Sequence, residues 1–208
     1  LADARLKLAS RSRGAESAVT RVPTSLRADA GLLFDHARYL RRRGQEQTAI
    51  PLLLTPPTAT HSIARPDRAW TERKILARKA LTEGHYQEAY GLATGHGHDR
   101  GVAFAEGEFL AGWIALQYLN DADRAFVHFQ TLAAGVTTPI SKSRGAYWMG
   151  RAAEARGRTD EALGYYRQAS SYPTTFYGQL ATSRLSSGGN ALLQLPVAPS
   201  PTAAHSGA

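Results

Sequence analysis

Apolar residues recur at helical spacing along most of the chain. Between about residue 24 and residue 182, Ala and Leu alternate with Arg and Glu at intervals of three and four, and alternating runs of Val, Ile and Thr are missing. A stripe with this period buries one face of a helix, whereas a half-buried strand requires a period of two. The pattern therefore predicts an all-α protein.

Three stretches of the predicted helices follow one plan, and they cover residues 81–93, 118–132 and 154–169. Each stretch ends a helix at Gly or Asn, turns through a few polar residues and opens a second helix that carries a small residue. The turn residues are Gly84, Asn120 and Gly157, and the small residues are Ala89, Ala125 and Ala162. Gly and Asn accept the left-handed conformation that ends a helix, and Ala lets two helices approach closely. The plan predicts helical hairpins whose turns lie 36 and 37 positions apart.

Aromatic residues follow the small residue by one helical turn in two of these hairpins. Phe129 lies four positions after Ala125, and Tyr166 lies four positions after Ala162. Residues at this spacing share a face of the helix. We therefore expect both rings to fill the groove between neighbouring helices.

A fourth hairpin is predicted over residues 32–54, with Gly44 at its turn and Ala49 at its crossing. Gly44 precedes Gly84 by 40 positions, because the Pro-rich stretch TPPTATHSIARPD lengthens this interval. One hairpin cannot bury its apolar face alone, so neighbouring hairpins have to stack. The expected fold is a right-handed superhelix of stacked helical hairpins, a tetratricopeptide-like α-solenoid.

The two ends of the chain differ in character from this central region, which we place at residues 23–185. In residues 1–22 the sequence predicts a basic leading helical segment that breaks near Gly14 and ends before Pro23. Residues 186–208 are rich in Ser, Gly, Pro and Ala, which is typical of a linker or tail. Since the chain begins at Leu1 rather than Met, we expect a fragment or a processed product, with any export signal upstream.

The chain is basic, with 25 Lys and Arg against 17 Asp and Glu and a formal net charge of +8. A positive net charge favours an anionic partner. The densest run is Arg41, Arg42 and Arg43, and the other Arg residues are scattered through helical segments, as on solvated helix faces. No basic stripe is interleaved with aromatic residues, so nucleic acid is not the expected partner.

Several kinds of chemistry lack their sequence signature. Cysteine is absent, which excludes disulfides, thiolate metal sites and a Cys nucleophile. No Gly-rich phosphate loop and no Gly-x-Ser-x-Gly elbow occurs, and no run of 18 apolar residues is present. We therefore expect no cofactor and no transmembrane segment.

The stretch GHGHD at residues 95–99 is the one candidate for a metal site. It brings His96 and His98 next to Asp99, but a zinc site needs further ligands, and the remaining His residues form no matching motif. The interpretation we favour is a turn between hairpins, with no metal.

The tryptophans and the densest aromatic run are interpreted as core residues between helices rather than as a ligand-binding surface. Trp70, Trp113 and Trp148 lie at or inside predicted helices, where packing between helices is the common role of such rings. The run SSYPTTFYGQLATSRL, residues 170–185, is the densest aromatic stretch. In it we expect Tyr172 and Pro173 to end one helix and Thr174 or Thr175 to cap the next. Phe176 and Tyr177 are expected to pin that new helix onto the last hairpin.

Three stretches in order resemble the helical superhelix domain of soluble lytic murein transglycosylases. They are AEGEFLAGWIAL at 105–116, GVTTPISKSRGAYWMGRAAEA at 135–155 and SSYPTTFYGQLA at 170–181. The resemblance extends upstream through VPTSLRADAGLLFDHARYLRRRG at 22–44 and PDRAWTERKILARKAL at 66–81. It spans most of the chain, from about residue 22 to residue 182.

The resemblance implies a periplasmic protein that acts on peptidoglycan. Members of this family cleave the bond between N-acetylmuramic acid and N-acetylglucosamine without water, and one Glu serves as general acid and then as general base. The muramoyl C6 hydroxyl is the nucleophile, so the product is a 1,6-anhydro sugar. A single carboxylate suffices because the nucleophile belongs to the substrate, in contrast to the paired carboxylates of ordinary glycosidases.

This chain departs from the family at the catalytic residues. The family's Glu lies in a lysozyme-like domain C-terminal to the superhelix, in a Glu-Ser motif followed by Gly-Leu-Met-Gln-Leu. Here the only Glu-Ser, Glu16-Ser17, precedes the predicted superhelix, and ALLQL at 191–195 lacks the Met. No catalytic residue is transferred, and the expected role is the non-catalytic superhelical portion of such an enzyme. The expected partners are peptidoglycan and a C-terminal lysozyme-like catalytic domain that this chain does not contain.

Two functions thus remain open from the sequence. Candidate contacts with glycan or with a catalytic domain are Arg41, Arg42, Arg43, Trp70, Tyr172, Phe176 and Tyr177. The alternative is a tetratricopeptide-like scaffold that binds a protein partner and has no link to the cell wall, because the repeat plan alone is common to unrelated scaffolds.

Overall fold

A computed structural model describes residues 1–55 and 66–186, and these residues form helices without strands. The Pro-rich stretch at 56–65 and the predicted tail from residue 187 onward lie outside the described residues. The expected all-α class is confirmed. The helices in chain order are α1 (Ala2–Ser10), α2 (Ala15–Thr20), the short 3₁₀ helix η1 (Thr24–Leu26), α3 (Ala30–Arg41), α4 (Glu46–Leu54), α5 (Pro66–Thr82), α6 (Tyr86–Thr94), α7 (Gly101–Gln117), α8 (Ala122–Gly135), α9 (Pro139–Ala155), α10 (Thr159–Ser170) and α11 (Phe176–Ser186).

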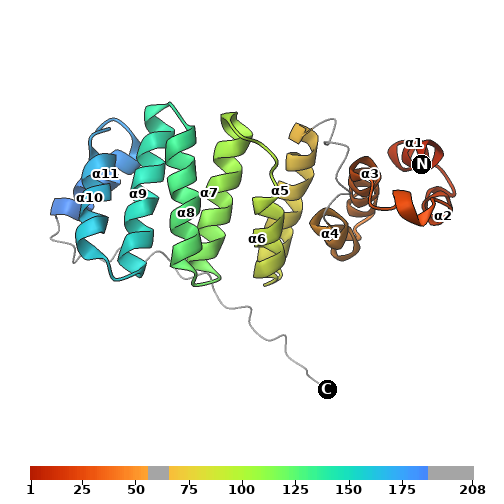
Figure 1. The fold of residues 1–208 in the computed structure, drawn as a ribbon, viewed down its shortest axis with the longest axis horizontal. Coiled ribbons are helices and arrows are strands. Elements are labelled where there is room, and N and C mark those ends of the chain that lie inside the picture. Colours follow the sequence, from red (N-terminus) through yellow and green to blue (C-terminus); the bar gives the residue numbers. More distant parts are fainter. Residues whose placement is uncertain (56–65, 187–208) are drawn as a thin grey trace, which may run out of the picture.

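Helices that are neighbours in the sequence pack against each other. The main pairs are α3 with α4, α5 with α6, α7 with α8, and α9 with α10, and each pair also touches the next. Figure 1 shows these pairs following one another along the long axis, from α1 at one end to α10 and α11 at the other. Segments far apart in the sequence therefore lie far apart in the molecule.

The hairpin turns have the conformation that the sequence predicts. Gly84, Asn120 and Gly157 have φ angles of 81°, 52° and 72°, and Gly44 has a φ of 72°. A residue in this region turns the chain out of a helix, and Gly does so without the steric cost of a Cβ. The predicted crossing residues Ala49, Ala89, Ala125 and Ala162 are buried.

Both predicted groove aromatics are buried against a glycine of the preceding helix. A Cβ added to Gly112 of α7 would lie 2.7 Å from the ring of Phe129, and one added to Gly150 of α9 would lie 2.6 Å from the ring of Tyr166. The two hairpins thus use the same contact, in which a missing side chain makes room for a ring. This confirms the expected role of Phe129 and Tyr166.

The leading segment packs onto the first hairpin. Its helices flank Gly14, where the sequence predicts a break, and Leu8 and Ala15 belong to the same core as Leu40 of α3. An ion pair of 2.7 Å between Arg5 and Asp35 also joins α1 to α3. Residues 1–22 therefore share their core with the helices that follow.

Candidate functional site

The arginine run that the sequence singles out is divided by the fold. Arg41 forms a bidentate ion pair with the buried Glu72 of α5, and Arg38 reaches the same carboxylate at 3.5 Å. The hydrogen bond that Arg41 donates to Glu72 is the main cause of the raised pKa of Arg41. Arg42 is exposed, and Arg43 lies 5.4 Å from the centre of the Tyr39 ring. Arg41 is thus a structural link between α3 and α5 rather than a free surface charge.

Trp70 does not offer a ring face to a glycan. Its side chain is only 3% exposed, and its indole N–H donates to Glu106 at 3.0 Å. Lys74 donates to the same carboxylate oxygen at 2.7 Å. Burial opposes ionisation of Glu106, but these two hydrogen bonds outweigh it and lower its pKa. Trp70 therefore joins α5 to α7, which is the core role that the sequence favours.

The aromatic run near the end of the chain forms a helix start. Thr175 caps α11, because its hydroxyl accepts from the Gly178 amide at 3.0 Å, and it donates to Ser143 of α9 at 2.8 Å. The ring of Tyr177 lies 5.4 Å from that of Tyr147 in α9. The sequence left Thr174 and Thr175 open as the helix cap, and the structure has Thr175 in that role.

Phe176 departs from its predicted role. Its side chain is 70% exposed, and its ring neighbour is the adjacent Tyr177. As the first residue of α11 it points away from the last hairpin, so it does not pin the helix. Tyr172 is half-buried in the turn that follows α10. Phe176 is the one candidate aromatic with most of its ring in solvent.

Replacing Gly178 by Ala is expected to detach the start of α11. A Cβ at this position would overlap the backbone carbonyl oxygen of Tyr172, which also accepts from the Thr175 amide at 3.0 Å. Overpacking of this kind is expected to lower the free energy of unfolding by about 2 kcal/mol. Urea denaturation measures this change.

The matched control for Gly178 is Gly164→Ala in α10, where an added Cβ meets nothing within 4 Å. Because Ala favours a helix interior over Gly, this change is expected to stabilise by about 0.5–1 kcal/mol. Equal effects of the two substitutions would contradict the contact.

The predicted site residues are not brought together. The arginine run lies on and after α3, Trp70 lies on α5, and the aromatic run lies around α11 at the opposite end of the molecule (Figure 1). Within the part of the chain that the structure describes, these residues therefore do not form one site. Any shared role would have to involve an extended surface.

A buried polar network at the centre of the chain is the most ordered cluster of titratable groups. Glu108 of α7 accepts from His96 at 3.0 Å through one oxygen and from His128 of α8 at 2.7 Å through the other. Tyr90 of α6 lies 2.9 Å from the second nitrogen of His128, and the His98 amide donates to the second nitrogen of His96 at 3.1 Å. The side-chain nitrogens of His96 and His128 and both oxygens of Glu108 thus have partners, which holds α6, α7 and α8 together.

The network fixes the protonation of its members. Because the His98 amide donates to Nδ1 of His96, the proton of that ring lies on Nε2 and points at Glu108. Burial raises the pKa of Glu108, but the hydrogen bonds from His128 and His96 outweigh this effect and lower it to about 2. Glu108 is therefore a carboxylate at neutral pH and cannot donate a proton as a general acid would.

Sequence reasoning considered His96 only as part of a metal motif. Its carboxylate partner lies 12 residues away and the other histidine 20 residues beyond that carboxylate, so no local motif links them. His98 lies 3.8 Å from Asp67. Within residues 1–55 and 66–186, no group of three His, Asp or Glu has a metal-binding arrangement.

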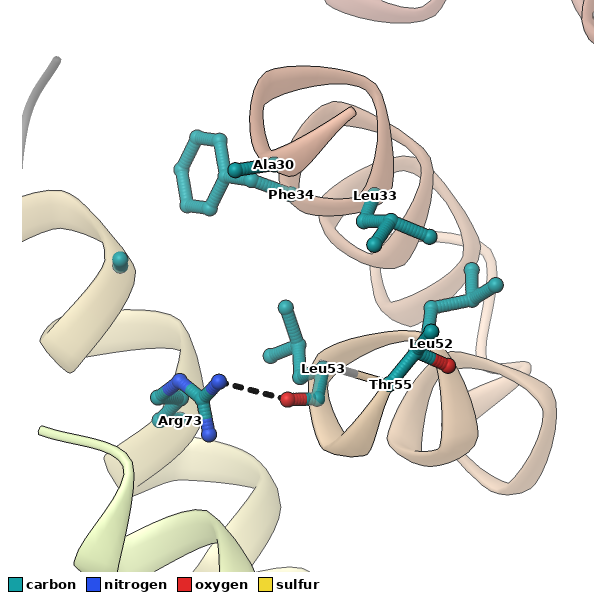
Figure 2. A pocket seen from close by; sticks show the side chains of 8 residues that line it. Ala30, Leu33, Phe34, Leu52, Leu53, Thr55 and Arg73 are labelled. Atoms are coloured by element: carbon teal, nitrogen blue, oxygen red, sulfur yellow. Dashed lines mark hydrogen bonds between the residues drawn. The ribbon is translucent and has the colours of Figure 1, made fainter. Parts of the chain in front are cut away.

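An apolar pocket lies between the first two hairpins, lined by Ala30, Leu33, Phe34, Leu52, Leu53, Thr55, Ala69 and Arg73. Figure 2 shows the guanidinium of Arg73 directed at the Leu53 carbonyl, to which it donates at 2.6 Å. A Cβ on Gly95 would overlap this guanidinium, so Arg73 lies between the C-terminal ends of α4 and α6. Burial lowers its pKa. Helix C-termini carry partial negative charge, so they account for the buried cation without a ligand.

The fold and these clusters define a class: an all-helical protein built of sequential helical hairpins, with its buried polar groups used to join one hairpin to the next. No family model, curated protein or solved structure matches this chain. Among the described helices, none is long and apolar enough to cross a membrane.

Proposed function

We propose that this chain is the non-catalytic superhelical portion of a periplasmic peptidoglycan lytic transglycosylase. The observation that carries the proposal is the contact between two stretches that underlie the family resemblance. Thr175 of SSYPTTFYGQLA hydrogen-bonds Ser143 of GVTTPISKSRGAYWMGRAAEA, and the Tyr177 ring packs on Tyr147 of the same stretch. A helical hairpin repeat requires neither stretch, so their packing as one unit favours this family over a general scaffold.

The proposal includes the arrangement of the hairpins as a right-handed, tetratricopeptide-like superhelix. Turn residues with positive φ, buried alanines at the crossings and packing between successive pairs support it. In the parent enzyme, a C-terminal lysozyme-like domain would then cleave the bond between N-acetylmuramic acid and N-acetylglucosamine. The superhelix would hold that domain and the glycan.

The pKa shifts of the carboxyl groups in the described residues agree with a non-catalytic role. Where a carboxyl pKa is shifted there, at Glu83, Glu106 and Glu108, the shift is downward. A general acid for glycosidic cleavage needs a raised pKa to hold its proton near neutral pH.

Sedimentation with purified sacculi tests the proposal. The chain is expected to co-sediment, and Arg42→Glu/Arg43→Glu to weaken binding about fivefold, as for a loss of about 1 kcal/mol. Arg41 is left intact because it pairs with Glu72. Arg167→Glu on α10, which also reverses an exposed charge, is the matched control and is expected to have little effect.

The same incubation separates a binding role from catalysis. No 1,6-anhydromuropeptides are expected in the supernatant, and their release by the chain would contradict the non-catalytic assignment. Failure to sediment with sacculi would contradict the peptidoglycan partner.

A second candidate, a protein-binding scaffold without a link to the cell wall, is favoured by a row of exposed apolar side chains. Val102, Ile140 and Phe176 are 78%, 68% and 70% exposed and occupy the first or second position of α7, α9 and α11. Exposed apolar residues at equivalent places often mark an interaction surface. If Val102→Ser/Ile140→Ser/Phe176→Ser leaves sacculus binding intact while abolishing capture of a protein partner, the row serves a partner and not the glycan.

A further inference from the structure

A partly open cavity of about 240 Å³, which we call the α2 cavity, lies between the leading segment and the first hairpin. Its apolar wall consists of Val19 from α2, Leu32 and Leu33 from α3, and Leu52 from α4. The space remains because α2 packs mainly on α1 and does not close onto α3 and α4. Leu33 and Leu52, labelled in Figure 2, also line the apolar pocket beside Arg73. The two hollows therefore share a wall, and the α2 cavity is the larger of them.

The walls of the α2 cavity suit an aliphatic chain better than water. At about 30 Å³ for each molecule, a space of about 240 Å³ has room for about eight waters. A bound water requires about two to four hydrogen-bond partners, and aliphatic side chains supply none. A methylene group occupies about the same volume as a water molecule, so a chain of about eight carbons fits the space.

Arg27 is the cation that lines the α2 cavity. Its Nε donates to the Val22 carbonyl at 3.0 Å, and its Nη2 donates to the Thr20 carbonyl at 2.9 Å. Both carbonyls lie at or just after the C-terminal end of α2, so they hold the guanidinium in place. Among residues 1–55 and 66–186, Arg27 forms no ion pair with a carboxylate, and its Nη1 has no hydrogen-bond partner. A fixed cation with a free donor is thus present at the cavity.

The other polar side chains that line the α2 cavity are those of Thr20 and His36, and each has a partner of its own. The Thr20 hydroxyl donates to the Ser17 carbonyl at 3.0 Å, and Nε2 of His36 lies 3.1 Å from the carboxylate of Glu16. No acidic side chain lines the cavity. The permanent charge in its lining is therefore positive, which favours a ligand with one negative group.

We propose that the α2 cavity binds a free aliphatic carboxylate of about eight carbons. The chain lies against Leu33 and Leu52, and the carboxylate accepts from Nη1 of Arg27. A hydrogen bond between two charged groups is stronger than one between neutral groups. Because Val22 and Thr20 already hold the guanidinium, little further ordering is needed on binding. This site is independent of the proposed link to peptidoglycan.

Isothermal titration calorimetry with straight-chain carboxylates, kept below their micelle concentrations, tests the size of the site. From butanoate to octanoate, each pair of added methylenes is expected to tighten binding about tenfold, because more apolar surface leaves water. Dodecanoate is expected to gain less than about threefold over octanoate, since its last carbons find no space. Affinity that rises steadily through dodecanoate, or no binding of octanoate, would overturn the proposal.

Octanol, which carries the same chain without a charge, tests the role of Arg27. The native chain is expected to bind octanol about tenfold more weakly than octanoate. In Arg27→Gln, octanoate is expected to bind only as well as octanol, while retained octanol binding shows that the cavity is intact. Arg21→Gln removes another exposed arginine of the leading segment and is expected to change neither affinity. Equal binding of octanol and octanoate by the native chain would overturn the assignment to Arg27.

Two measurements locate the ligand. In the native chain, nuclear Overhauser contacts are expected between octanoate and the methyl groups of Leu33 and Leu52, and contacts only with methyl groups elsewhere would overturn the site. Val19→Phe is expected to weaken octanoate binding about tenfold or more, because the ring takes up the space of the chain. Val127→Phe, at a valine of α8 that is 56% exposed, is the matched control and is expected to leave binding unchanged. Unchanged binding in Val19→Phe would equally contradict a ligand in this cavity.

Discussion

Replacing Phe129 by Ala is expected to lower the free energy of unfolding by about 4 kcal/mol. The ring is fully buried between α7, α8 and α9, with its centre 5.6 Å from that of Trp148 and 6.2 Å from that of Phe109. Its removal loses the burial of an aromatic side chain and leaves a cavity beside Gly112, because a rigid helix pair closes only partly around it. Urea denaturation followed by far-UV circular dichroism measures the change.

Gly112 supplies the control for the Phe129 prediction. Gly112→Ala places a Cβ 2.7 Å from the ring and is expected to destabilise by about 1–3 kcal/mol. In the Phe129→Ala background the same substitution enters the vacated space and is expected to be neutral or stabilising. Additive effects of the two changes would mean that ring and glycine do not share a contact.

The second large effect is expected at Glu108, where replacement by Ala should lower the free energy of unfolding by about 3 kcal/mol. The substitution leaves N–H groups of His96 and His128 without their acceptor in a largely buried site. It also removes the hydrogen bonds that join α7 to α8 and to the loop after α6. Hydrogen exchange is expected to rise in these three segments and not at α10 and α11.

Glu108→Gln is the matched variant, because an amide fills the same space and keeps one acceptor. We expect it to cost less than half as much as Glu108→Ala. Equal losses in the two variants would indicate that packing, rather than hydrogen bonding, accounts for the role of Glu108.

The acid dependence of stability provides a separate readout of Glu108. Its folded-state pKa of about 2 lies below the ordinary value of 4.5, so its contribution is complete above about pH 4.5 and is lost as the pH falls toward 2. The stability difference between the native chain and Glu108→Gln is therefore expected to shrink over this range. A constant difference from pH 6 to pH 2.5 would contradict the lowered pKa.

The local plan of the fold could be predicted because its requirements are local. A turn after a helix needs a left-handed residue, and the close crossing after it needs a small one, so Gly84 and Ala89 can be recognised from their spacing. A threonine cap for the last helix follows in the same way, although the sequence left the choice between Thr174 and Thr175 open. The burial of Phe129 and Tyr166 follows from helical periodicity.

The candidate site residues were less predictable, because exposure depends on what packs against a residue from elsewhere. Arg41 and Arg42 are adjacent and alike in sequence, yet Arg41 is hydrogen-bonded to Glu72, 31 positions away, whereas Arg42 is exposed to solvent. Phe176 and Tyr177 are likewise adjacent, but only Tyr177 faces α9. One position along a helix turns a side chain by about 100°, which is enough to separate core from solvent.

By itself, the sequence determined the helical class, the hairpin turns and the small residues at the crossings, since all of these obey rules that act within a few residues. Only the tertiary structure decided which charges are paired. Glu108 between two histidines, Arg73 between two helix ends and Arg41 against Glu72 each combine groups from separate helices. The physical reason is that the energy of a charge depends on the distance to its partners and on burial, and packing between helices sets both.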